Sequence, residues 1–211
     1  MVMALKPIYD LAKIKRVIVS TYQAVSGAGK EGIDELDAQV REHSEGREMT
    51  ANILPSASAE KHYPIAFNLI PQIDVFCENL YTKEDMKMVN ETIKIMEDYE
   101  MRITATTIRV PVYRSHSESV NIELEKEVDL GAMREALAKF PGVTVQDDPS
   151  KQEYPMPLYT SEKDDVYVGR LRRDESCEKS YNMWVVGDQI RKGAALNTLQ
   201  IAETMIKNGW I

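Results

Sequence analysis

A helix with a complete start signal, set between two strand-like runs, constrains the fold of this chain more than any other feature. Thr82-Lys83-Glu84-Asp85 has the form of a capping box, and apolar residues then recur at spacings of 3, 4 and 3, at Met86, Val89, Ile93 and Met96. This pattern predicts an amphipathic helix over residues 83–98. Residues 16–22 and 103–112, on either side, have the β-branched and alternating patterns of strands. The chain therefore combines strands with covering helices.

The remaining sequence continues this alternation. The fold class that follows is α+β, with a mixed, largely parallel sheet covered by helices. Residues 30–60 are polar and predict a surface helix followed by a loop, which would form an insertion or flap. The helical pattern near the N-terminus begins without a capping residue, so we expect the chain to start inside a longer helix. The pattern predicts further helices at residues 3–12, 129–140 and 194–207, and further strands at 119–124, 143–146, 166–171 and 182–186.

Length and charge exclude several classes of protein. The 211 residues, 43% hydrophobic and 28% charged, suit one domain with a buried core. The formal net charge of −8 argues against binding nucleic acid or an anionic membrane, because both require a basic face. The sequence has no apolar run approaching about 18 residues and no N-terminal signal pattern. We therefore expect neither a nucleic-acid nor a membrane partner, and a cytoplasmic location.

The two cysteines predict neither a disulfide nor a metal site. Cys77 and Cys177 lie far apart and outside any Cys-x-x-Cys spacing. Two buried structural thiols are the expected state.

A glycine pattern after the first strand raises the question of a nucleotide cofactor. Gly27-x-Gly29-x-x-Gly32 matches a dinucleotide-binding turn, but that turn needs its first glycine at the end of a strand, inside a complete βαβ unit. Here other residues separate the strand from Gly27, and polar sequence follows where a second parallel strand is required. The alternative is a glycine-rich loop that lets the backbone approach another group closely.

Six separated segments together resemble one family. They are VSTYQAVSGAG, KHYPIAFNLIPQID, MVNETIKIM, IRVPVYRSHSESVNIE, VGRLRRD and KGAALNTLQIAET. The resemblance is to aspartate-semialdehyde dehydrogenases of the bacterial type and extends from Met1 to about Glu203. It implies an enzyme with an N-terminal NADP-binding domain and a C-terminal catalytic and dimerisation domain of the glyceraldehyde-3-phosphate-dehydrogenase-like fold. Residues 1–211 match the second domain only.

The resemblance also implies that parts of the enzyme are absent from this chain. The family's nucleophilic cysteine lies in an Asn-Cys-Ser/Thr segment shortly before the position of Met1, and the cofactor domain precedes it. Neither Cys77 nor Cys177 lies in such a motif, and their surroundings do not suggest a stabilised thiolate. We therefore expect an excised domain without its nucleophile, inactive by itself.

The resemblance assigns four residues to the substrate and cofactor sides of the site. Gln23 would hold the substrate near the reacting carbon, since a carboxamide both donates and accepts. From the residues alone, a loop-bracing role is favoured. Ser26 and Gly27 match a segment that lies against NADP. Gln189 matches a position that reaches the nicotinamide end of the cofactor.

Glu84 and Lys87 have two interpretations. They lie three residues apart at the start of the predicted helix and share one face. With Glu91 and Lys94 they form a pattern that also suits a solvated salt-bridge ladder. The resemblance assigns Glu84 to the substrate ammonium and Lys87 to a phosphate, and a helix N-terminus favours such an anion.

Arg109 and His116 are the two strongest candidates for the reaction. Arg109 would bind the α-carboxylate of an aspartyl compound with its planar guanidinium, whereas a lone strand arginine is more often a surface residue. The resemblance makes His116 the general acid and base. Seven fully extended residues would span roughly 23 Å. Both side chains can reach one small substrate only if the chain bends near Pro111.

The complete enzyme implied by the resemblance reduces 4-aspartyl phosphate to aspartate semialdehyde and phosphate with NADPH, through a cysteine acyl-thioester. The expected assembly is a homodimer, or a tetramer. Two alternatives remain. A related reductase for N-acetylglutamyl phosphate would not need Glu84 for a free ammonium, and a non-catalytic dimerisation module would need no nucleophile.

Overall fold

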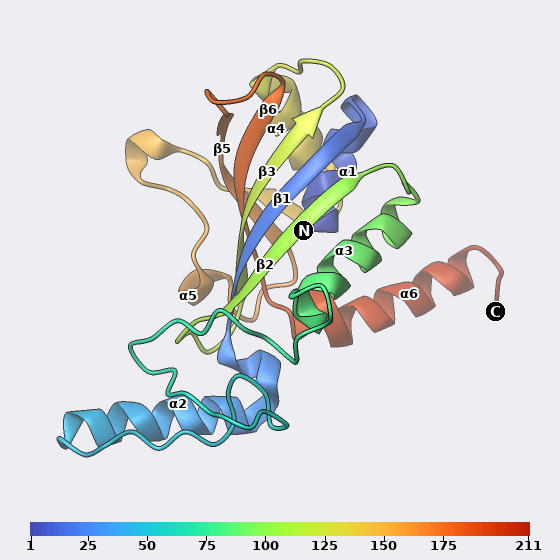
Figure 1. Ribbon diagram of the computed structural model, residues 1–211. Coiled ribbons are helices and arrows are strands. Elements are labelled where there is room, and N and C mark those ends of the chain that lie inside the picture. The colour runs from blue at the N-terminus through green and yellow to red at the C-terminus, as the bar shows by residue number, and fades with distance from the viewer.

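Residues 1–211 are described by the computed structural model, in which six strands form one sheet. The strand order is β2-β1-β3-β6-β5-β4 (Figure 1). The strands are β1 (Ile14–Gln23), β2 (Arg102–Arg109), β3 (His116–Leu124), β4 (Val143–Val145), β5 (Val166–Arg173) and β6 (Ser180–Gly187). The helices are α1 (Val2–Leu11), α2 (Gly29–Ser44), α3 (Lys83–Met96), α4 (Leu130–Lys139), α5 (Pro157–Thr160) and α6 (Leu196–Lys207).

The α+β class with a mixed sheet is confirmed, but the expectation of a largely parallel sheet is corrected. β1 pairs in parallel with β2, and β4 with β5. The other three pairings, β1 with β3, β3 with β6 and β5 with β6, are antiparallel. The apolar run in β1 that suggested a parallel sheet belongs to a strand with one neighbour of each kind. Strand direction depends on the connections between strands, which the residues within a strand do not encode.

One face of the sheet carries the main core. Leu5 and Ile8 of α1 are fully buried against alternate residues of the central strands, such as Val17, Val19 and Ile122. The helices α1, α3 and α4 contact one another or the strands on this side of the sheet (Figure 1). This layer fixes the ends of the strands, where the candidate site lies.

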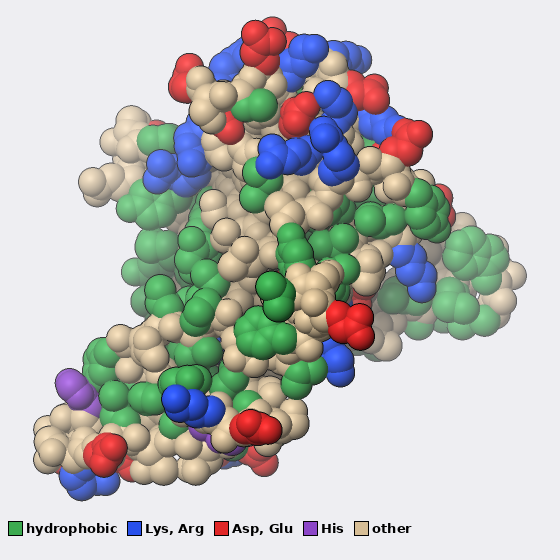
Figure 2. All heavy atoms as spheres, viewed as in Figure 1, with side chains coloured by type: hydrophobic (Ala, Val, Ile, Leu, Met, Phe, Trp, Pro, Cys, Tyr) green, Lys and Arg blue, Asp and Glu red, His purple; other side chains and the backbone are tan.

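The opposite face of the sheet has no layer of long helices. Tyr22 of β1 and Trp184 of β6 pack together there, with ring centroids 5.5 Å apart. Ser119, on the central strand β3, pairs with Trp184 in the register and is exposed. The middle of the surface in Figure 2 carries many hydrophobic and few charged side chains, while charged side chains gather at the top. An uncovered sheet face of this kind can pack against another molecule.

The segment after β1 forms a second, smaller unit. A 3₁₀ turn at Val25–Ala28 leads into α2, which extends away from the sheet (Figure 1). Gln39 of α2 is fully buried, and its Oε1 accepts hydrogen bonds from the backbone N–H groups of Ile65 and Ala66 at 2.8 and 3.0 Å. The helix and following loop match the expected arrangement of residues 30–60, and the buried glutamine ties the two together.

The glycine pattern lies in this turn and the first turn of α2, rather than at a strand end. β1 ends at Gln23, the 3₁₀ turn contains Gly27, and α2 begins at Gly29 with a φ of +80°. A Cβ at Gly32 would lie 2.6 Å from the Val25 carbonyl oxygen, so this position needs a glycine for close backbone packing. The strand that pairs in parallel with β1 is β2, which begins only at Arg102.

The expectation that both cysteines are buried is wrong. Cys77 is half-buried and Cys177 is exposed, and both are free thiols. Cys177 lies in the turn between β5 and β6, and a sequence pattern does not reveal how far such a turn is covered. None of the helices has the length and apolar composition of a membrane span.

Candidate active site

Three strand ends meet at one edge of the sheet. Gln23 and Arg109 are the last residues of β1 and β2 and lie opposite each other in the parallel register. His116 is the first residue of β3, whose next residue, Ser117, pairs with Tyr22 of β1. The chain reverses between Arg109 and His116, and the buried Ser115 adopts a left-handed φ of 67°. This bend brings together two residues that an extended chain would keep apart.

Ala24 joins Arg109 and His116 through its backbone. The Arg109 guanidinium donates a hydrogen bond from Nη1 to the Ala24 carbonyl oxygen at 2.6 Å. The Ala24 N–H donates to Nδ1 of His116 at 3.1 Å. Both side chains are therefore held by the residue that follows Gln23, at the end of β1.

Arg109 is a buried cation without an ion-pair partner. Its exposed fraction is 3%, and no carboxylate lies within 4.0 Å of its guanidinium. Its Nε is buried without a hydrogen bond. Burial lowers the pKa of Arg109 to about 10, partly offset by the charge of Glu84. The guanidinium stays charged at neutral pH, and a buried charge of this kind favours an anionic ligand.

His116 is neutral in this environment. Burial, followed by the charges of Arg109 and Lys87, lowers its pKa to about 3. Because Nδ1 accepts a hydrogen bond from Ala24, the proton of the neutral ring is on Nε2. Nε2 makes no hydrogen bond within the protein and is free to meet a ligand, since the ring lines the cavity.

The capping box of α3 sets the position of Glu84 and Lys87. Thr82 accepts from the Asp85 N–H, and Asp85 accepts from the Thr82 N–H, as the sequence predicts. Asp85 also accepts from the N–H and hydroxyl of Thr107 on β2, at 2.7 and 2.8 Å. The start of α3 is thereby held against Thr107, which precedes Arg109 by two residues on β2.

Glu84 contacts two other candidate site residues, Gln23 and Lys87. Its carboxylate accepts from Nε2 of Gln23 at 3.2 Å and lies 3.5 Å from Nζ of Lys87. Glu84 is the more enclosed residue of the ion pair, with a side-chain exposed fraction of 20% against 55% for Lys87. Lys87 thus lies at the outer part of the site, where an anion can reach its ammonium.

A cavity of about 790 Å³ unites these groups. It is lined by seven of the eight predicted site residues: Gln23, Gly27, Glu84, Lys87, Arg109, His116 and Gln189. The eighth, Ser26, lies beside it and accepts a hydrogen bond from Nε2 of Gln189 at 2.6 Å. Cys77 and Cys177 are not in the lining, and no group of three or more His, Cys, Asp or Glu side chains is arranged to hold a metal ion.

Two residues of the site, Glu118 and Ala24, were not predicted from the sequence. Glu118 lines the cavity and shares a face of β3 with His116, two residues away. The prediction began this strand at residue 119, and a start at 116 would have revealed that shared face through the two-residue period of a strand. The backbone of Ala24 carried no sequence signal, because any residue has these backbone groups.

Residues 5–192 match the family model described as semialdehyde dehydrogenase, dimerisation domain. The chain belongs to the semialdehyde dehydrogenase family. Within it, this dimerisation domain is of the aspartate-semialdehyde dehydrogenase type, which confirms the resemblance seen in the sequence. It is 53% identical over 211 residues to the aspartate-semialdehyde dehydrogenase of Aquifex aeolicus, an alignment that covers 100% of this chain and 60% of that protein.

Solved structures support the same assignment. Aspartate semialdehyde dehydrogenase II from Vibrio cholerae has a TM-score of 0.91 and 43% identity, covering 98% of this chain and 59% of that one, and it has also been solved complexed with ASA. The Candida albicans enzyme, solved with NADP, has a TM-score of 0.68 over 99% of this chain and 55% of its own, and at 22% identity it shares the fold alone. The semialdehyde dehydrogenase dimerisation domain described here thus spans about 60% of the length of its curated relatives.

Proposed function

We propose that this domain binds the substrate and forms the dimer of an enzyme that reduces 4-aspartyl phosphate to aspartate semialdehyde and phosphate with NADPH. The observation that carries the proposal is the buried, unpaired guanidinium of Arg109 beside a neutral histidine. A cavity with this cation, a carboxylate and an ammonium is complementary to a small zwitterion that also carries a phosphate.

Arg109 and Glu84 would bind the amino-acid end of the substrate. The planar guanidinium of Arg109 suits the α-carboxylate, and Glu84 suits the α-ammonium. Gln23 donates to Glu84 and so braces the carboxylate, while its own carboxamide lines the cavity. Holding both charged groups fixes the reacting carbon in place, which lowers the entropic part of the barrier.

Lys87 would receive the phosphate. Its ammonium is more exposed than the Glu84 carboxylate and lies in the first turns of α3, where the helix dipole favours an anion. Neutralising the leaving group in this way assists departure of phosphate, and in the reverse direction it binds free phosphate.

His116 would act as the acid and base. The unliganded ring, with a pKa near 3, is ready to accept a proton, but it is too weak a base to hold one at neutral pH. A substrate carboxylate on Arg109 cancels the nearest positive charge and raises the pKa of His116 toward the working range. Substrate binding would therefore make the histidine a better proton carrier.

Ser26, Gly27 and Gln189 would contact NADP. They fit a ligand there, because Oε1 of Gln189 is buried without a hydrogen-bond partner and Gly27 lines the cavity without a side chain. The cofactor, when bound, supplies the hydride. These three residues would orient it and close the cavity on that side.

The nucleophile and most of the cofactor site would come from residues outside these 211. Met1 and Val2 line the same cavity as His116, so a segment joined to Met1 would enter the site directly. A cysteine on that segment could form the acyl-thioester. We expect residues 1–211 alone, with residues 30–60 as a flap, to bind ligands without turnover.

The uncovered sheet face would form the homodimer. It contains the Tyr22 and Trp184 pair and the exposed Ser119, and no long helix covers it. Two copies packed through such faces would bury these side chains.

The deciding experiment measures NADP reduction by the purified chain with aspartate semialdehyde and phosphate, after circular dichroism has established folding. We expect no turnover, and turnover would contradict the need for outside residues. Calorimetric titration with aspartate semialdehyde should detect binding that R109Q removes. A folded chain without such binding would contradict the substrate assignment.

The role of Glu84 is tested with the N-acetyl derivative of the same aldehyde. We expect E84Q to weaken binding of the free amine about tenfold and to leave the N-acetyl derivative unaffected, because only the free amine is charged. The reverse preference would favour the N-acetylglutamyl phosphate type of reductase.

A further inference from the structure

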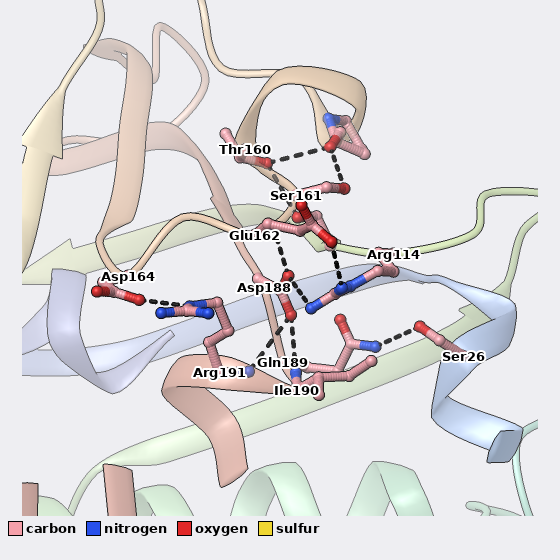
Figure 3. Close-up of polar contacts among 12 residues, drawn as sticks. Ser26, Arg114, Thr160, Ser161, Glu162, Asp164, Asp188, Gln189, Ile190 and Arg191 are labelled. Carbon is pink, nitrogen blue, oxygen red and sulfur yellow. Dashed lines mark hydrogen bonds and ion pairs between the residues drawn. The ribbon is translucent and has the colours of Figure 1, made fainter. Parts of the chain in front are cut away.

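Three segments of the chain meet at one buried carboxylate, that of Asp188. This residue follows β6, has an exposed fraction of 0%, accepts three backbone hydrogen bonds and forms one ion pair (Figure 3). Its Oδ1 accepts from the backbone N–H groups of Ile190 and Arg191 at 2.9 and 3.3 Å. Its Oδ2 accepts from the Glu162 N–H at 2.7 Å and lies 2.8 Å from Nη2 of Arg114.

Each of these segments leads to the candidate site or supports it. Arg114 lies in the bend between Arg109 and His116. Glu162 follows α5 and also pairs with Arg114, at 3.1 Å. Ile190 and Arg191 begin the turn that leads into α6, immediately after Gln189. Asp188 is the only side chain that contacts all three segments in Figure 3.

Gln189 is oriented by this arrangement. Its neighbours on both sides are fixed, since Asp188 is buried and the Ile190 N–H is bound to the same carboxylate. The side chain then points toward the site, where Nε2 donates to Ser26 at 2.6 Å and Oε1 remains without a partner. A carboxylate that accepts two successive N–H groups after its own residue holds a turn in one conformation.

We propose that Asp188 is a positioning residue that fixes Gln189 for the cofactor and, through Arg114, ties that turn to the bend preceding His116. The proposal rests on the proposed function of Gln189. Asp188 does not itself line the cavity, so it acts only through these neighbours.

The kinetic test uses the full-length enzyme that carries this domain. In D188N one oxygen becomes an NH₂ group, so two of the four contacts to the carboxylate lose their acceptor oxygen while the size of the side chain is kept. We expect both D188N and Q189A to raise the KM for NADP about tenfold, with the KM for aspartate semialdehyde within about twofold. The double variant should be no worse than Q189A, because both changes remove the same contact.

A matched control changes the same turn at the surface. Asp164 pairs with Arg191 and is more than half exposed, so D164N removes a charge contact to this segment without touching Asp188. We expect its kinetic constants to stay unchanged. If D188N does not fold, R114Q replaces it, because Asp188 keeps its three backbone donors in that variant. We then expect a smaller rise in the KM for NADP.

A spectroscopic measurement on the 211-residue chain separates this proposal from the proposed function. In ¹⁵N spectra, we expect D188N to shift and broaden the Gln189 side-chain amide, whereas D164N leaves it in place. An unaltered Gln189 signal in folded D188N, or additive effects in the double variant, would overturn the positioning role. If D188N changes the Gln189 amide signal but Q189A leaves the KM for NADP unchanged, Asp188 positions Gln189, and Gln189 does not contact the cofactor.

Discussion

Arg109 and His116 are held by the two polar backbone groups of one residue. The Ala24 carbonyl accepts from the guanidinium at 2.6 Å, and the Ala24 N–H donates to the imidazole at 3.1 Å. The charge of Arg109 is one of the causes that lower the pKa of His116, second only to burial. A cation and a proton carrier are therefore coupled both by position and by charge.

This coupling predicts the effect of removing the charge. In R109Q the pKa of His116 should rise from about 3 but stay below its ordinary value of 6.5, because burial remains. NMR titration of the His116 ring protons in the 211-residue chain measures it. K87Q is the control and should give a smaller rise, since the charge of Lys87 lowers the pKa of His116 less than that of Arg109 does. An unchanged pKa in R109Q would contradict the coupling.

Gly27 should be intolerant of a side chain for a reason specific to the site. A Cβ there would lie 2.5 Å from Nη1 of Arg109 and 3.5 Å from Cε1 of His116. We expect G27A to cost about 1–3 kcal/mol of unfolding free energy and to weaken substrate binding, because the guanidinium must move.

G29A is the comparison for this change. Gly29 has a φ of +80° and open space around it, so an alanine there is strained without touching Arg109. Urea unfolding should detect a stability loss in both variants, with substrate affinity reduced in G27A alone. Equal loss of affinity in the two would show that the contact with Arg109 is unimportant.

The lowered pKa of His116 predicts how the stability of the fold depends on pH. The unfolded chain gains a proton at His116 below pH 6.5, whereas the folded chain does so only near pH 3. The contribution of His116 to the unfolding free energy is therefore fully present above pH 6.5. It falls as the pH drops, with a slope of up to about 1.4 kcal/mol per pH unit.

The window from pH 6.5 to about 5 isolates this effect, because carboxylates titrate at lower pH. H116Q should flatten the curve of unfolding free energy in that window, as measured by urea unfolding. Identical slopes in the wild-type chain and H116Q would mean that His116 gains its proton at the same pH in the folded and unfolded chains, which would contradict the lowered pKa.

The uncovered sheet face predicts the oligomeric state. An arginine at Ser119 would place a charge in the middle of the proposed interface, so S119R should convert a dimer into a monomer in sedimentation velocity. A138R is the control, because Ala138 is exposed on α4, on the covered side of the sheet. A dimer that persists in S119R would contradict the assignment of this sheet face as the dimer interface.

Local signals predicted individual elements well. The capping box and the apolar period of residues 83–98 correspond to α3, where Asp85 forms both expected contacts. The six family segments contain five of the eight candidate site residues, namely Gln23, Ser26, Gly27, Arg109 and His116. Such features act between neighbours in the chain, so the sequence contains them directly.

The tertiary structure decided how these elements meet. Strand pairing made the sheet mixed with three antiparallel pairs, placed His116 at the first position of β3, and brought Glu118 into the cavity. Burial left Cys77 half-covered and Cys177 exposed. The backbone of Ala24 became the link between Arg109 and His116, although an alanine carries no polar side chain. These outcomes depend on contacts between residues distant in sequence, whose free energies no local pattern records.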